Sequence, residues 1–84
     1  MPWYSCPFEK SHYYRVKRSV AELGHIFAEG EIVRFQDHSY DPKQGLIRFW
    51  FHTPNSGETK AWHVWEAEIE SLSRWEDTFA PEPG

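Results

Sequence analysis

Residues 46–65 read LIRFWFHTPNSGETKAWHVW, and this stretch decides the fold. In its first eight residues Ile and Phe occupy every second position, as a strand with one buried face requires. The sequence PNSG at residues 54–57 collects residue types that favour reverse turns. Residues 58–65 are therefore expected to return antiparallel to residues 46–53, so the stretch predicts a β-hairpin.

The turn length fixes the predicted register of this hairpin. With four residues in the turn, Thr53 lies opposite Glu58, and each step outward adds one further pair. One face then collects the side chains that we expect to form the core: Ile47, Phe49, Phe51, Trp62 and Val64. The opposite face carries three cross-strand pairs: Arg48 with His63, Trp50 with Ala61, and Leu46 with Trp65.

Weaker alternation earlier in the chain predicts two further strands. Residues 13–20 and 31–37 alternate in the manner of half-buried strands, with Val33 and Phe35 on one side of the second. Between them, residues 21–30 place apolar side chains between two glycines without a helical repeat. We expect this segment to be a long, folded-back loop.

The two ends of the chain differ from its middle. Ile69 and Leu72 lie three residues apart, the spacing of a short helical turn. Residues 76–84 contain two prolines and few apolar side chains, so we expect a flexible tail. Residues 1–11 also contain two prolines and are expected to form an N-terminal arm, which leaves residues 12–75 as the domain proper.

The composition fits one small domain with a core made mainly of rings. The chain has 84 residues, with fifteen Phe, Trp and Tyr residues against eleven Leu, Ile and Val. Each buried ring removes about 150–250 Å² from water, so few residues can build a core. No apolar run approaches the ~18 residues of a membrane span, and residues 1–7 do not resemble a secretory signal. A soluble protein without membrane contact is expected.

Charge and cysteine content narrow the expected partners and compartment. The net charge is −4 with histidine neutral, which disfavours a general affinity for nucleic-acid backbones. Cys6 is the only cysteine, so no disulfide can form within the chain and a reducing cytoplasm is expected. The five histidines and Cys6 have none of the close spacings of zinc ligands. No metal and no cofactor is therefore predicted.

Two segments carry a resemblance to a known family. The pattern Phe27-x-x-Gly30-Glu31, followed by an alternating strand, resembles the diverging turn of the SH3-like small β-barrel superfamily. Residues 62–72 are similar to the closing strand and one-turn helix of such barrels. The resemblance covers residues 12–75 and extends more loosely to uncharacterised bacterial single-barrel proteins. It implies an all-β fold: a small SH3-like barrel of about five antiparallel strands, with one short helical turn near the C-terminus.

The chain departs from the polyproline-binding members of that superfamily. Their closing helix has the pattern Pro-x-x-Tyr, whereas residues 68–71 of this chain read EIES, with neither proline nor tyrosine. The resemblance therefore implies the fold, and recognition of polyproline segments is not expected.

The face opposite the predicted core is the candidate binding surface. It groups four residues: Arg48, Trp50, His63 and Trp65. Trp and Arg dominate many interfaces, and the outside of a small barrel is otherwise expected to be polar. His63 is expected to resist protonation beside Arg48. The alternative is that the arm, through Trp3 and Phe8, or the later residue Phe79 covers both tryptophans.

The sequence therefore predicts a non-catalytic interaction module whose partner is a protein or peptide. The alternative is a nucleic-acid-binding barrel in which Arg15, Lys17 and Arg18 contact phosphates. An enzyme would need a nucleophile such as Cys6 beside a base such as His12. Because Cys6 lies in an arm without rigid support, no catalytic residue is predicted.

Overall fold

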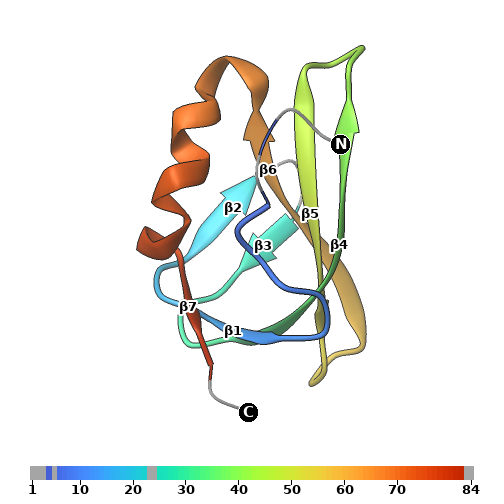
Figure 1. Cartoon of the computed structure of the whole chain (residues 1–84). Helices are drawn as coiled ribbons and strands as arrows, with labels where there is room; N and C mark the ends of the chain where they lie inside the picture. Colours follow the sequence, from blue (N-terminus) through green and yellow to red (C-terminus); the bar gives the residue numbers. More distant parts are fainter. Residues whose placement is uncertain (1–3, 5, 23–24, 83–84) are drawn as a thin grey trace.

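The computed structural model describes residue 4 and the ranges 6–22 and 25–82 of the chain (Figure 1). Antiparallel strands make up most of its secondary structure, which confirms the predicted all-β fold class. The strands are β1 (Tyr13–Val16), β2 (Val20–Glu22), β3 (His25–Phe27), β4 (Ile32–Asp41), β5 (Leu46–Thr53), β6 (Glu58–Trp65) and β7 (Phe79–Pro81). A 3₁₀ helix, η1 (Glu66–Asp77), connects β6 to β7. No helix in these ranges is long and apolar enough to cross a membrane.

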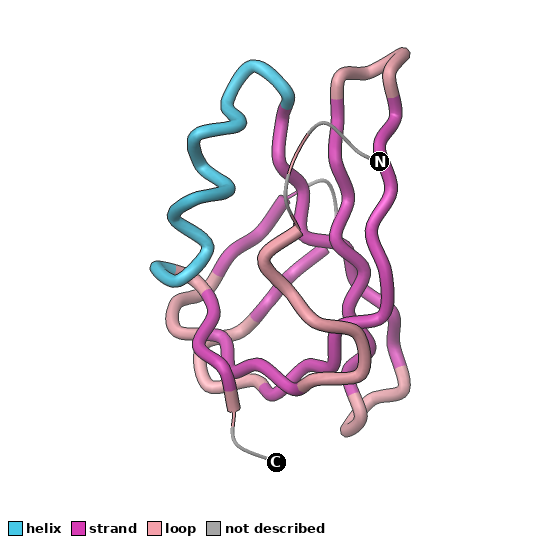
Figure 2. Tube along the Cα trace, viewed as in Figure 1, coloured by secondary structure: helices cyan, strands magenta, loops and turns pink. Residues whose placement is uncertain are grey.

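Five strands form one sheet in the order β6-β5-β4-β1-β7, and β2 and β3 form a separate hairpin. The large sheet curls around the core, as the tube in Figure 2 shows, but β6 and β7 remain its two edges. No sheet in the described ranges is closed into a barrel, so the predicted barrel closure is not met. Hairpin β2–β3, through β3, lies beside the outer edge of β6 without joining the large sheet.

Hairpin β5–β6 has the predicted strands and the predicted register. Thr53 pairs with Glu58, and Phe49 pairs with Trp62. In the turn, Gly57 has a φ of 72°, which glycine adopts without strain, and its N–H donates to the Thr53 carbonyl at 2.8 Å. The five side chains predicted to form the core face are all at most 6 % exposed, which confirms that face.

Strand β4 runs past its predicted end at residue 37. The register with β5 shifts at Gln36, a β-bulge that adds one residue to this strand. The extra residue allows Phe35 and His38 to face the core together, with ring centroids 6.4 Å apart. The His38 ring also stacks on Phe49 at 6.0 Å. Beyond the bulge, Ser39 and Asp41 lie on the side of the sheet opposite the core.

The loop predicted over residues 21–30 contains a hairpin instead. The predicted first strand stops at Val16, and β2 then pairs with β3 through Val20 and Phe27. Phe27 is buried at 1 % exposure, so this hairpin is attached to the core by one large ring. Strands of three residues carry too few positions for alternation to reveal them. Residues 23–24 lie outside the described part of the chain.

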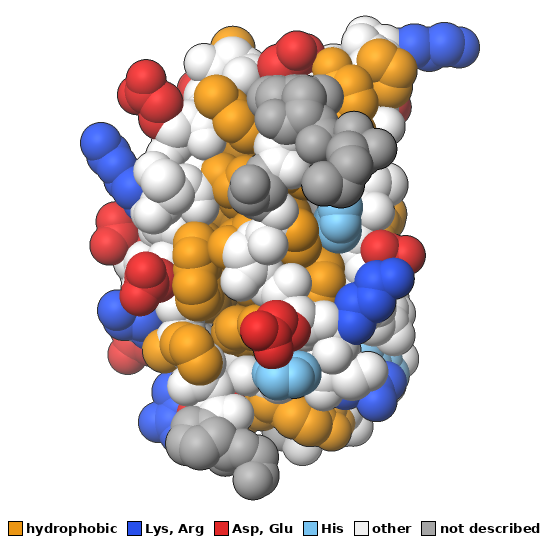
Figure 3. Space-filling view, in the orientation of Figure 1, with side chains coloured by type: hydrophobic (Ala, Val, Ile, Leu, Met, Phe, Trp, Pro, Cys, Tyr) orange, Lys and Arg blue, Asp and Glu red, His pale blue; other side chains and the backbone are white. Residues whose placement is uncertain are grey.

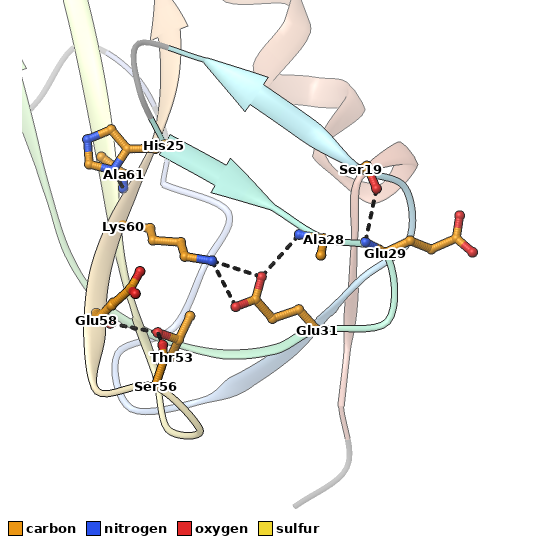
Figure 4. A network of polar contacts seen from close by, with 10 residues as sticks. All are labelled: Ser19, His25, Ala28, Glu29, Glu31, Thr53, Ser56, Glu58, Lys60 and Ala61. Carbon is orange, nitrogen blue, oxygen red and sulfur yellow. Dashed lines mark hydrogen bonds and ion pairs between the residues drawn. The ribbon is translucent and has the colours of Figure 1, made fainter.

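A carboxylate clamp holds the end of this hairpin beside β6. Glu31 accepts a hydrogen bond from the Ala28 N–H at 3.1 Å and lies 2.9 Å from Lys60 Nζ (Figure 4). The Glu31 and Lys60 side chains are only 20 % and 15 % exposed. Gly30, with a φ of 87°, supplies the sharp turn that brings Glu31 back toward Ala28.

The core consists mainly of aromatic rings, and Phe8 of the N-terminal arm contacts many of them. Seven ring centroids lie 5.0–5.9 Å from that of Phe8: Tyr14, Phe35, Phe49, Phe51, Trp62, Trp75 and Phe79. Tyr4 docks nearby, with its hydroxyl 2.6 Å from His38 Nδ1. In Figure 3, apolar side chains form a band between η1 and β4 on this side of the molecule. The arm therefore completes the core.

The helical segment is longer than the single turn predicted. It spans twelve residues, with non-helical backbone angles at Glu68 and Arg74. Leu72 is buried, and Ile69 and Trp75 are half-buried against the core. Their three-residue spacing matches the 3₁₀ repeat and continues through Trp75, which explains the additional length.

The prediction of a flexible tail over residues 76–84 is wrong for β7. This strand pairs with β1, with Val16 opposite Phe79. Phe79 is fully buried and stacks on Phe51 with ring centroids 4.9 Å apart. One aromatic side chain thus anchors a segment whose average composition is that of a disordered tail.

Candidate functional site

The register of hairpin β5–β6 brings the four candidate residues onto one face. Arg48 pairs with His63, Trp50 with Ala61, and Leu46 with Trp65, as predicted. Their exposure differs widely. Trp65 is 41 % exposed, Arg48 and Trp50 are half-buried, and His63 is only 6 % exposed. The four residues therefore share a face without forming one open patch.

The second half of β4 engages the two candidate residues on β5. Beyond the bulge, Ser39 pairs with Arg48. The Arg48 guanidinium Nη1 lies 3.7 Å from Asp41 Oδ2, and Trp50 Nε1 donates to Ser39 Oγ at 3.4 Å. Both polar groups thus have partners within the chain, which reduces what they can offer to a ligand.

Hairpin β2–β3 covers the middle of this face through His25. His25 Nδ1 accepts a hydrogen bond from the Ala61 backbone N–H at 3.2 Å (Figure 4). The His25 ring centroid lies 5.4 Å from that of His63 and 6.4 Å from that of Trp50. Ala61 is consequently buried at 1 % exposure.

The residues predicted as alternative covers of the two tryptophans lie elsewhere. Phe8 and Phe79 are both in the core, on the other side of the sheet from Trp50 and Trp65. Trp3 lies outside the described residues. The cover that does exist comes from His25, which was not predicted there because its hairpin was expected to be a loop.

His63 is a buried titratable group at the edge of the sheet. Burial, followed by the charges of His25 and Arg48, holds the pKa of the imidazole below its usual value. This direction agrees with the expected resistance to protonation, although burial is a larger cause than Arg48. His63 Nδ1 is buried and has no hydrogen-bond partner among the described residues.

A groove of about 520 Å³ lies along the outer edge of β6, next to Trp65. Its lining comes from the start of β2 (Arg18, Ser19, Val20), from β6 (Trp62, His63, Val64, Trp65) and from the end of the chain (Glu68, Arg74, Asp77, Thr78). Of the four candidate residues, the groove therefore contains His63 and Trp65. Glu68 and Arg74 were missed because they lie in a segment predicted from its apolar spacing, and Asp77 was missed because it lies in the predicted flexible tail.

The predicted basic cluster is divided by contacts within the chain. Arg15 donates to both carboxylate oxygens of Glu82, at 3.0 and 3.1 Å. Lys17 Nζ donates to the Glu76 carbonyl at 2.7 Å. Arg18 alone of the three lines the groove.

Cys6 and His12, considered above as a nucleophile and its base, each have another partner. The Cys6 thiol donates to the Phe8 carbonyl at 3.5 Å, and burial raises its pKa, which disfavours the reactive thiolate. His12 Nδ1 lies 3.2 Å from Glu9 Oε2. Within the described ranges, no group of three or more His, Cys, Asp and Glu side chains could hold a metal ion.

Comparison with known proteins identifies a structural relative. No protein-family model matches the chain, and no curated protein matches it in sequence. Among solved structures, it is similar to an integron cassette protein from the mobile metagenome of Vibrio cholerae, with a TM-score of 0.72. The two chains are 15% identical, and the match covers 90% of this chain and 87% of the other. This likeness is one of fold.

Proposed function

We propose that the chain is a small non-catalytic interaction module whose ligand is a segment of a protein or a peptide. The observation that carries this proposal is the groove beside β6, which has an exposed tryptophan at its side and four charged residues in its lining. Trp65 is the proposed anchor, because a large ring can gain further burial when a partner docks. His63 also lines the groove, and Arg48 and Trp50 lie on the same face of the hairpin outside it.

The proposed relationship to SH3-like barrels is supported by the order of the elements. A short strand is followed by a hairpin, three long antiparallel strands, a 3₁₀ helix and a last strand that returns to β1. A reducing cytoplasm remains the proposed compartment, since Cys6 has no second cysteine to pair with.

The alternative, a nucleic-acid-binding module, has less support. Arg15 and Lys17 are both engaged within the chain, and the net charge of −4 opposes phosphate. A fluorescein-labelled oligothymidine should therefore show little binding to the protein. Tight binding that falls steeply between about 50 and 200 mM salt would favour this alternative instead.

Selection from a phage-displayed random peptide library tests the proposal. We expect peptides that bind the parent protein and lose at least about tenfold in affinity, equal to about 1.4 kcal/mol, with Trp65→Ala. The matched control is Tyr13→Ala, because Tyr13 is similarly exposed at 37 % but lies on β1, outside the groove. Failure to select any peptide, or equal binding to all three proteins, would count against a peptide site at Trp65.

A further inference from the structure

The outer edge of β6 has backbone groups without partners. β6 pairs with β5 on one side, and no strand in the described ranges pairs with its other side. The Ala61 N–H, which donates to His25, shows that the odd-numbered residues of β6 direct their backbone groups away from β5. His63 is the next such residue, and no described residue binds its outward N–H and C=O groups.

The groove begins where the cover of this edge ends. His25 caps the edge at Ala61, whereas at His63 and Trp65 the edge forms the floor of the groove. The start of β2 and the residues of η1 stand on either side. An added strand lies about 4.8 Å from its neighbour, so an extended backbone seated in the groove would reach the outward groups of His63.

The charges in the groove indicate the chemistry of its occupant. Arg18 and Arg74 are exposed cations and Glu68 and Asp77 are exposed anions, and none of the four has an ion-pair partner among the described residues. A partner whose charges complement both cations and both anions would itself carry both signs.

We propose that an extended peptide segment with both acidic and basic side chains adds to β6 at His63 as a further strand. Addition to a sheet edge obtains affinity from main-chain hydrogen bonds and specificity from the side chains that flank them. This inference rests on the proposed function, because it specifies how the peptide ligand is held. It also explains why an open edge, which ordinarily invites aggregation, is left between charged residues.

Two short peptides serve as probes: acetyl-TVKVEV-amide and its charge-swapped form acetyl-TVEVKV-amide. With either peptide in excess, we expect the His63 amide to exchange its hydrogen at least about tenfold more slowly. Each peptide can be N-methylated either on its odd-numbered or on its even-numbered residues. One of these two patterns should abolish binding and the other should leave it nearly unchanged, because only alternate N–H groups of the added strand face β6.

Matched peptides and one variant test the role of charge. The like-charged forms, acetyl-TVKVKV-amide and acetyl-TVEVEV-amide, should bind at least about tenfold more weakly than the mixed forms. In Arg18→Glu, an exposed position without a partner, preference should shift toward the form with two lysines. Equal binding of all four peptides to the parent would overturn the charge assignment.

The outcomes separate this inference from the proposed function. If no probe slows exchange at His63 even at millimolar concentration, strand addition is wrong. The charged residues would then serve only to prevent strand pairing at this edge. If library-selected peptides depend on Trp65 without protecting His63, the proposed function stands and this inference fails. Protection of His63 that depends on protein concentration alone would show a second copy of the chain at the edge, which also contradicts it.

Discussion

On the core face of hairpin β5–β6, the five predicted core side chains are at most 6 % exposed, whereas on the opposite face exposure ranges from 0 % at Leu46 to 41 % at Trp65. Both faces arise from one alternating sequence. The core face is sealed by rings from the rest of the chain, Phe8 among them. The opposite face is covered where β4 and His25 reach it, and it opens toward the groove. Alternation therefore assigns a residue to a face, and distant elements decide whether solvent reaches it.

Adjacent substitutions on β5 test this contrast with the largest expected effect. Phe49→Ala should lower the free energy of unfolding by about 3–5 kcal/mol, because it removes a fully buried ring. Trp50→Ala, one residue further along and only half-buried, should cost clearly less. Urea denaturation of both variants measures the difference. A greater loss in Trp50→Ala would mean that the two faces have been assigned the wrong way round.

The attachment of hairpin β2–β3 should give an intermediate effect. Glu31→Gln weakens the clamp to Lys60, whose ammonium group would remain mostly buried, so we expect a loss of about 1.5–3 kcal/mol. Glu82→Gln is the control, since it weakens the more exposed pair with Arg15 and should cost about 0–1 kcal/mol. Equal losses in the two variants would show that the clamp does not hold the cover in place.

The sequence predicted the central hairpin completely and its surroundings only in part. Residues 46–65 carry strong alternation and a four-residue turn, which together determine strands, register and faces. The short strands β2, β3 and β7 carry too few positions for such a test. β3 and β7 are attached to the core through one ring each, Phe27 and Phe79, and β2 packs against it through Val20. The site shared this limit. Arg48, Trp50, His63 and Trp65 were placed on one face, but the position of His25 over the middle of that face depends on long-range contacts between β3 and β6.

Stability should also depend on the protonation of His63. Because the folded state lowers the pKa of this imidazole, the folded protein binds a proton less readily than the unfolded chain. Stability is then fully present above the unfolded pKa of about 6.5 and is lost as the pH falls below it. Urea midpoints measured between about pH 7.5 and pH 5.5 should fall less in His63→Gln than in the parent. Identical slopes would mean that His63 does not contribute.

Trp65→Ala should have the smallest effect on folding. Trp65 is the most exposed of the four candidate residues, so its truncation should change the free energy of unfolding by about 1 kcal/mol or less. Thermal unfolding followed by circular dichroism measures this change. A loss as large as that of Phe49→Ala would show that Trp65 supports the fold rather than a partner.

The indole N–H signals of the tryptophans in a ¹⁵N-labelled sample test the central claim most directly. On titration with peptides selected from the library, the Trp65 signal should shift progressively, because this ring lies beside the groove. Trp62 also lines the groove, but its ring packs against Phe49 and the residue is only 6 % exposed, so its signal should shift less. If the largest shift instead belongs to Trp75, which lines an apolar hollow with Pro7 and Leu72, the ligand binds elsewhere and the account of the open edge of β6 is contradicted.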